Sequence, residues 1–217
     1  MDKSRNILDR NYWQKTLEEQ EPRRGYSDGF KLLYSPWSVI ELTDMLFLSL
    51  NPGNDPSGEF MRVASDERGN SYLVQRDAKH SPIAVQFQRL CSFVGRDPEE
   101  VLTGVIMPFR TPNWNPLRDR KNIAVTRPFW QHVTSEQKIR HIFCMGREVE
   151  EEAVALTNAV LVQEIAANWG KLSIRRYEAE NGVQIYGLLH FSTYKMFQRP
   201  QCVQQLEILL KPAMVDR

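Results

Sequence analysis

The chain has 217 residues, of which 41% are hydrophobic and 25% charged, a mixture typical of a globular domain with a buried core. We expect a single domain over 1–217, with 1–41 as an N-terminal helix and loop decoration. The formal net charge is +1, so any basic surface for nucleic acid would be local. No apolar run approaches the roughly 20 residues that span a bilayer, and the charged N-terminus lacks an apolar signal core. We therefore expect a soluble, cytoplasmic protein.

The cysteines and histidines give no sign of a metal site. The 3 cysteines, Cys91, Cys144 and Cys202, stand far apart among apolar residues, and no Cys-x-x-Cys pair exists. The 4 histidines lack the spacing of metal ligands. We therefore expect small buried thiols, and neither a metal nor a cofactor.

The first half of the chain predicts a helix, a buried strand and a long polar connection before a second helix. The predicted elements are a helix over 6–19, a strand over 45–50, a connection over 54–82 and a helix over 81–95. Ser81, Pro82 and Gly95 are typical of the cap, the first turn and the end of that second helix. Long loops in compact domains are often functional, which draws attention to the connection.

The second half of the chain alternates apolar runs with helical patterns. The predicted elements are strands over 100–109 and 139–146, helices from Pro128 and over 147–161, a hairpin over 172–190 that turns at Asn181-Gly182, and a helix over 199–211. This order predicts the α/β class, as a three-layer αβα sandwich with a central, mainly parallel four-stranded sheet.

Ligands of such sheets bind in the crevice beyond the carboxyl ends of the strands. This rule selects the loops over 51–60 and 108–118, the turn after Met145, and the loop over 190–199. Candidate functional residues are therefore sought in these loops.

The first of these loops contains two overlapping polar signatures, NPG at 51–53 and GNDP at 53–56. The apolar run LFLSL ends directly at Asn51, and a strand would not continue through the Pro-Gly pair to Asp55. We therefore expect Asn51 to face the site and Asp55 to cap the turn or assist at the rim. If Asp55 instead faced the crevice, the two residues would exchange roles.

The other loops contain cations, hydroxyls, aromatic rings and one histidine. Cations with hydroxyls suit phosphate, aromatic rings suit a planar base, and a histidine beside Asn or Asp suits stabilisation of a developing anion. Alone, NPG would indicate a turn, and His190 could equally be a core histidine. Their coincidence at the ends of successive strands favours a functional site. The cations are Arg110, Arg118, Lys195 and Arg199.

At these residues the sequence resembles the uracil-DNA glycosylase superfamily. That family's first motif follows its first core strand as Gly-x-Asn-Pro-Gly or Gly-Gln-Asp-Pro, and its last motif follows the last strand as His-x-Ser or Asn-Pro-Ser. Here LSLNPG resembles the first motif and HFS, at 190–192, the last. VLTGVIMPFRTP and IFCMGREVEE are similar to the segments between them, and the resemblance spans 42–211.

The resemblance implies hydrolysis, in DNA, of the bond between a flipped-out base and its deoxyribose, without a metal or cofactor. Asn51 would position water or stabilise the sugar cation, and His190 would stabilise the negative charge on the leaving base. Phosphate contacts are expected from Ser192, Thr193, Lys195 and Arg199, and a wedge that fills the vacated space from Tyr194 or Phe197.

The residues expected around the base are Gly53, Phe60, Tyr72, Gly104, Phe109 and Arg110. We prefer Phe60 over Tyr72 as the ring that stacks on the base. Some family members place an Asn that reads uracil where this chain has Gly104. Either Arg110, Asn113 or backbone groups read the base, or the base is larger than plain uracil and occupies the room that a glycine leaves.

Other departures from the family pattern are smaller. Ser49 stands where the family usually has Gly, and Phe191 where many members have Pro. The missing cysteines exclude the branch that carries an iron–sulfur cluster.

Two other functions stay open at this stage. One is a non-catalytic binder or sensor of modified DNA on the same fold, for which binding would occur without an abasic product. The other is a hydrolase of nucleosides or nucleotides, for which the modest net charge leaves room. The Arg and Lys residues in the loops over 108–118 and 190–199 favour a glycosylase over these two alternatives.

Overall fold

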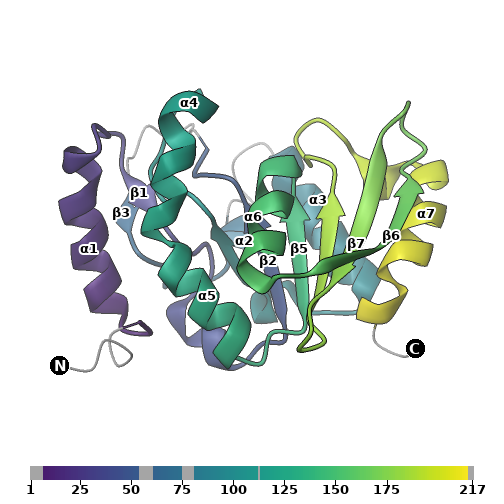
Figure 1. The fold of residues 1–217 in the computed structure, drawn as a ribbon, viewed down its shortest axis with the longest axis horizontal. Coiled ribbons are helices and arrows are strands. Elements are labelled where there is room, and N and C mark those ends of the chain that lie inside the picture. Colours follow the sequence, from purple (N-terminus) through teal and green to yellow (C-terminus); the bar gives the residue numbers. More distant parts are fainter. Residues whose placement is uncertain (1–6, 54–60, 75–80, 112, 215–217) are drawn as a thin grey trace.

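The computed structural model describes residues 7–53, 61–74, 81–111 and 113–214, which form a mixed α/β fold around a six-stranded sheet (Figure 1). The strands, in sheet order, are β4 (Leu102–Val105), β2 (Met45–Ser49), β5 (His141–Met145), β8 (Gln184–Leu188), β7 (Ser173–Glu178) and β6 (Val160–Ala166). The pairings of β4 with β2, β2 with β5, and β5 with β8 are parallel, and those of β8 with β7 and β7 with β6 are antiparallel. The expected mainly parallel sheet is confirmed, but the expected four strands are wrong because β7 and β6 extend it.

Helices connect the strands and pack on the sheet. They are α1 (Arg10–Arg23), α2 (Ser71–Val74), α3 (Pro82–Val94), α4 (Pro116–Asp119), α5 (Arg127–Glu136), α6 (Arg147–Thr157) and α7 (Pro200–Leu210). Short 3₁₀ helices cover Trp37–Glu41, Pro98–Glu100, Arg120–Val125, Met196–Gln198 and Lys211–Ala213, and two short strands, β1 (Phe30–Lys31) and β3 (Arg62–Val63), pair in parallel. Within the described ranges, none of the helices has both the length and the apolar composition needed to cross a bilayer.

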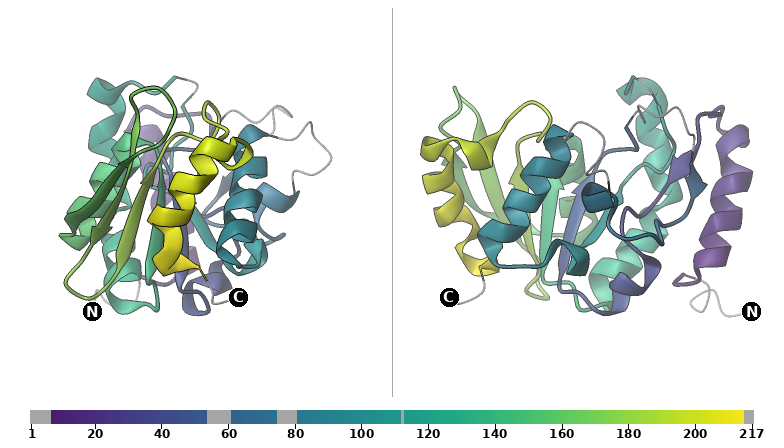
Figure 2. Two further views of the ribbon diagram at one scale, coloured as in Figure 1. Left: turned by 90° about the vertical axis from the view of Figure 1, so that its right-hand side faces the viewer. Right: turned by 180° about the vertical axis from the view of Figure 1, so that it is seen from behind.

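Both faces of the sheet are covered by helices, as the views in Figure 2 show. Along β2, Met45 and Phe47 pack into one core with residues of α3 and α7, and Leu46 and Leu48 pack into the other with residues of α5 and α6. Successive side chains of a strand point to opposite faces, so a strand buried on both sides is apolar throughout. This explains the unbroken apolar run that precedes Asn51.

The N-terminal region is part of the core, and its description as a decoration is wrong for residues 29–34. This segment lies along the outer edge of β4, where the Tyr34 amide donates to the Thr103 carbonyl over 2.8 Å. The Val105 amide donates to the Leu32 carbonyl over 3.0 Å, and Leu32 and Leu33 are fully buried. The segment thus covers an edge that would otherwise expose unpaired backbone groups.

The predicted helix over 147–161 ends earlier than expected. Asn158 adopts the left-handed conformation, with φ of 51°, and ends α6 after Thr157. The chain then forms β6 at the far edge of the sheet. A left-handed residue at a helix end is more often glycine than Asn, so the sequence did not indicate that the helix ends here. By contrast, α3 begins at Pro82 and ends at Val94, where Gly95 caps it with a φ of 75°, as predicted.

Gly104 is required by close packing and leaves no room for a base. A Cβ on this residue would lie 2.7 Å from Cη2 of Trp130 and 2.8 Å from the carbonyl oxygen of Leu32. The glycine therefore allows α5 and the segment over 29–34 to approach β4. The expectation that Gly104 opens space for a larger base is wrong.

Gly104→Ala should lower the free energy of unfolding by about 1–3 kcal/mol, because the added methyl group overlaps a buried ring and a backbone oxygen. Gly53→Ala is the control, because a Cβ there would have no heavy atom of the described residues within 4 Å. Its unfolding free energy should stay within about 0.5 kcal/mol of the wild-type value in urea denaturation. Equal stability of the two variants would contradict this account of Gly104.

Candidate functional site

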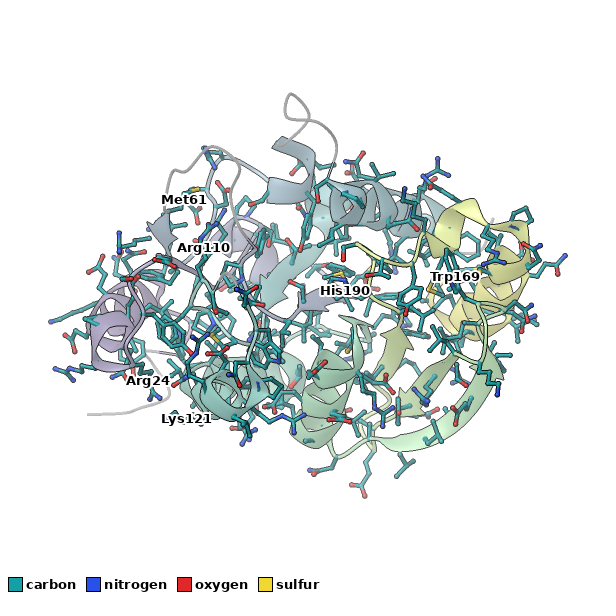
Figure 3. The ribbon with its side chains drawn as sticks, turned by 90° about the horizontal axis from the view of Figure 1, so that it is seen from above. Arg24, Met61, Arg110, Lys121, Trp169 and His190 are labelled. Carbon is teal, nitrogen blue, oxygen red and sulfur yellow. The ribbon has the colours of Figure 1, made fainter. Side chains whose placement is uncertain are left out.

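Asn51 and His190 emerge at the same edge of the sheet. Leu48, Cys144 and Gly187 form one row across β2, β5 and β8, because Leu48 pairs with Cys144 and Cys144 with Gly187. Asn51 and His190 each follow this row by three residues along parallel strands. Only β5 separates the two strands, so their backbones are offset by roughly 10 Å, twice the interstrand spacing. Figure 3 looks onto this edge and shows Arg110, His190 and Trp169 spread across it.

The amide of Asn51 is oriented by backbone carbonyls. Its Nδ2 donates to the oxygen of Pro52 over 3.2 Å and lies 3.5 Å from the oxygen of Thr111. The half-buried side chain thereby uses its donor group within the protein. Its Oδ1 accepts no hydrogen bond within the described residues, which leaves an oriented acceptor at the edge of the sheet.

Arg110 fastens the turn that follows Asn51. The chain after β4 runs beside the end of β2, with the Met107 amide donating to the Leu50 carbonyl over 2.9 Å. The Arg110 guanidinium donates to the Gly53 carbonyl over 2.5 Å. Arg110 is only 6% exposed, so its observed role is to hold the turn.

A buried carboxylate holds the loop that contains Thr111. Asp119 is fully buried and accepts hydrogen bonds from the Tyr26 hydroxyl over 2.7 Å and from the Arg118 guanidinium. Arg118 also donates to Oγ1 of Thr111 over 2.7 Å. Burial opposes ionisation of Asp119, but the hydrogen bonds from Arg118 and Tyr26 outweigh it and lower the pKa of the carboxyl. Asp119 is therefore linked, through Arg118, to Thr111, whose carbonyl oxygen lies near the Asn51 amide.

Contacts with Ser192 determine which ring nitrogen of His190 carries the proton. Its Nδ1 lies 2.8 Å from Oγ of Ser192 and accepts from the Ser192 amide over 3.4 Å. A backbone amide can only donate, so we assign the ring proton of the neutral imidazole to Nε2. Burial lowers the pKa of His190, and the opposing charge of Glu148 is a smaller effect. The neutral ring is thus favoured at neutral pH.

Gly146, which follows β5, lies beside His190. Its φ of 96° favours glycine, and a Cβ there would lie 3.6 Å from Cδ2 of the His190 ring. The middle strand of the three therefore ends without a side chain between Asn51 and His190.

Three of the aromatic rings expected in the site belong to the core. Phe109 is fully buried and stacks on Tyr26 with 5.0 Å between ring centroids. Tyr72 is 7% exposed and stacks on Tyr34 at 5.1 Å. The wedge assignment of Phe197 is wrong, because the ring is 7% exposed and packs edge-on against Phe93 and Phe191. The expected places of Phe109 around the base and of Tyr72 as the second choice for stacking are wrong for the same reason.

The remaining predicted residues are either on the surface or outside the described ranges. Asp55 and Phe60 lie outside the described residues. Tyr194 is half-buried, and four predicted phosphate contacts are exposed after β8, namely Ser192, Thr193, Lys195 and Arg199. Gly53 is exposed beside the Asn51 turn.

Two features of this region were not predicted. Lys31 and Asp66 form a buried ion pair at 3.1 Å, with Oγ of Ser71 3.3 Å from the ammonium group. Burial lowers the pKa of Lys31 although Asp66 opposes it, and these partners stand too far apart in the chain for a sequence pattern to connect them. The second feature is Trp169, which follows β6 and was missed with that strand.

Comparison with known proteins leaves this chain without a match, either to a protein-family model or to a curated protein. Within the described ranges, no group of three or more His, Cys, Asp or Glu residues is placed to hold a metal ion. All three cysteines are buried with free thiols, as predicted.

The fold should lose stability as the pH falls below about 6.5, the ordinary pKa of histidine. His190 has a lowered pKa in the folded state, so the unfolded state takes up the proton first and is favoured. Urea unfolding at about pH 7.5 and pH 5.5 measures this loss.

His190→Asn should lose less stability between the two conditions than the wild type. His141 also has a lowered pKa, so part of the loss should persist in the variant. Equal losses in the two proteins would exclude a contribution from His190.

Proposed function

We propose that the protein is a monofunctional DNA glycosylase that hydrolyses the N-glycosidic bond of a flipped-out uracil-like or modified base. The observation that carries this proposal is the pair of Asn51 and His190, which follow one row of the parallel sheet by the same number of residues. Helices on both faces of the sheet are compatible with the three-layer αβα sandwich of the uracil-DNA glycosylase superfamily, which the two motifs resemble.

The two side chains suit the charges that develop when a glycosidic bond breaks. Bond breaking leaves positive charge on the sugar and negative charge on the base. The Nε2–H of a neutral His190 can donate to a base oxygen as that negative charge grows. Oδ1 of Asn51, which has no donor among the described residues, can accept from a water molecule and orient it towards the sugar. An amide is a weak base, so Asn51 orients the water without deprotonating it.

Exposed cations beside His190 favour DNA over a free nucleoside as substrate. Lys195 and Arg199 lie in the loop after β8, and Ser192 and Thr193 add exposed hydroxyls. These groups suit phosphates that flank an extruded base. A free nucleoside has no such phosphates, so this surface would have no partner in nucleoside hydrolysis.

Recognition of the base falls to groups near the Asn51 turn. Gly104, Phe109 and Tyr72 are occupied by core packing, as described above. We propose that Gly53 and the backbone around it contact the base. Stacking of the base on Phe60 and assistance from Asp55 stay predictions.

Asn51→Ala and His190→Ala should each lower the rate of base excision by on the order of 10²–10³-fold, because each removes an oriented dipole used in the transition state. DNA affinity should change little, since neither residue is proposed to contact phosphate. The measurement is single-turnover formation of abasic sites in duplexes that carry uracil, mismatched thymine, hydroxymethyluracil, hypoxanthine or bulkier modified bases.

The controls are Asn11→Ala and His132→Ala, which make the same chemical changes on α1 and α5. Both should retain wild-type rates. Full activity of the Asn51 and His190 variants would refute their roles. DNA binding without abasic product on any base would favour the sensor, and hydrolysis of free nucleosides alone would favour the nucleoside hydrolase.

A further inference from the structure

The loop between β6 and β7 lies at the same edge of the sheet as His190. β6 runs antiparallel to β7, and β7 runs antiparallel to β8, so β6 and β8 end on the same side. Figure 3 shows Trp169, from this loop, beyond His190 on the edge that faces the viewer. Nδ2 of Asn168 donates to the carbonyl of Gln201 over 3.0 Å, which ties the loop to the start of α7.

Trp169 holds the guanidinium group of Arg199 over its ring. The central carbon of the Arg199 guanidinium lies 4.6 Å from the indole centroid. Tyr194 packs edge-on against the indole at 5.5 Å between ring centroids and an interplanar angle of 87°. An arginine stacked on an aromatic ring loses freedom while its N–H groups stay available at the rim. The indole thus orients the cation and leaves its hydrogen-bond donors unused.

Arg199 has no counter-ion in the described part of the chain. Its guanidinium makes no ion pair or hydrogen bond there, and the residue is exposed. Arg147 and Arg175, by contrast, are paired with carboxylates: Arg147 lies 2.9 Å from Glu150, and Arg175 lies 2.9 Å from Glu164. An oriented cation without a carboxylate partner is suited to an external anion.

Nearby groups add to the positive potential. Lys195 and Lys171 are exposed on the two loops that Trp169 and Arg199 belong to, and neither makes an ion pair within the described ranges. Arg199 is also the N-cap of α7, whose first turn has no capping side chain. The partial positive charge of a helix N-terminus favours an anion at that position.

We propose that Trp169 is a positioning residue that presents Arg199 to a backbone phosphate of the DNA. This extends the DNA-binding surface from the His190 loop to the β6–β7 loop. The inference rests on the proposed function, because it takes DNA as the substrate.

The test measures DNA binding as a function of salt concentration, with a fluorescein-labelled duplex that carries no modified base. Arg199→Gln should lower the slope of log K against log salt by about one, the change expected for one lost phosphate contact. Arg140→Gln is the matched control, because Arg140 is exposed just before β5 at the opposite edge of the sheet. Its slope should equal that of the wild type.

Variants of Trp169 separate positioning from folding. Trp169→Leu retains an apolar side chain but removes the ring face, and it should weaken binding about 2- to 5-fold. Trp169→Phe restores an aromatic face and should recover most of that loss. In the Arg199→Gln background, Trp169→Leu should have no further effect, because the cation that the ring orients is absent. Thermal unfolding checks that each variant is folded.

The outcomes separate this inference from the proposed function. Salt-dependent binding by the wild type, with an unchanged slope in Arg199→Gln, would refute the phosphate contact and leave the glycosylase intact. Additive effects of Trp169→Leu and Arg199→Gln would refute positioning by the indole. Absence of DNA binding by the wild type would refute both.

Discussion

Parallel pairing of β2 with β5, and of β5 with β8, is the constraint on which the rest of the structure depends. It aligns Leu48, Cys144 and Gly187 in one row and sends the following residues to one edge. Parallel strands also require long crossover connections, which here contain α3, α5 and α6. These helices bury both faces of the central strands, so β2 and β5 carry polar side chains only at their ends. The same pairing therefore produces both the core and the edge at which we propose the reaction takes place.

Polar groups at the strand ends are held by hydrogen bonds within the protein. Asp119 organises the loop that carries Thr111, and Arg110 fastens the turn at Gly53. Ser192 fixes the donor and acceptor roles of the His190 ring. Oriented dipoles in a partly dry environment stabilise developing charge more strongly than free solvent can, because they need no reorganisation during the reaction. Asp119 and Arg110 thus matter to the proposed reaction without contact to the substrate.

Local sequence patterns correctly predicted the helices and turns that are marked by proline, glycine or an Asn-Gly pair. Pro82 and Gly95 mark the ends of α3, and Asn181-Gly182 marks the turn between β7 and β8. β6 was missed because Asn158 ends α6 without a glycine, and because an exposed edge strand shows no clear alternation. The segment over 29–34 was taken for decoration because its partner, β4, lies about seventy residues further along the chain. Pairing between segments so far apart in the chain cannot be predicted from a local sequence pattern.

The sequence by itself determined the α/β class, the parallel core strands and the loops in which Asn51 and His190 stand, because apolar runs and turn residues are read locally. Only the tertiary structure decided which side chains are exposed and can contact a ligand. Phe109, Tyr72 and Phe197 carry the same aromatic chemistry as a base-stacking residue, but neighbours from distant segments enclose them. Gly104 likewise makes room for Trp130 instead of a ligand. The stacking of Trp169 with Arg199 depends on two loops that only the folded sheet brings together.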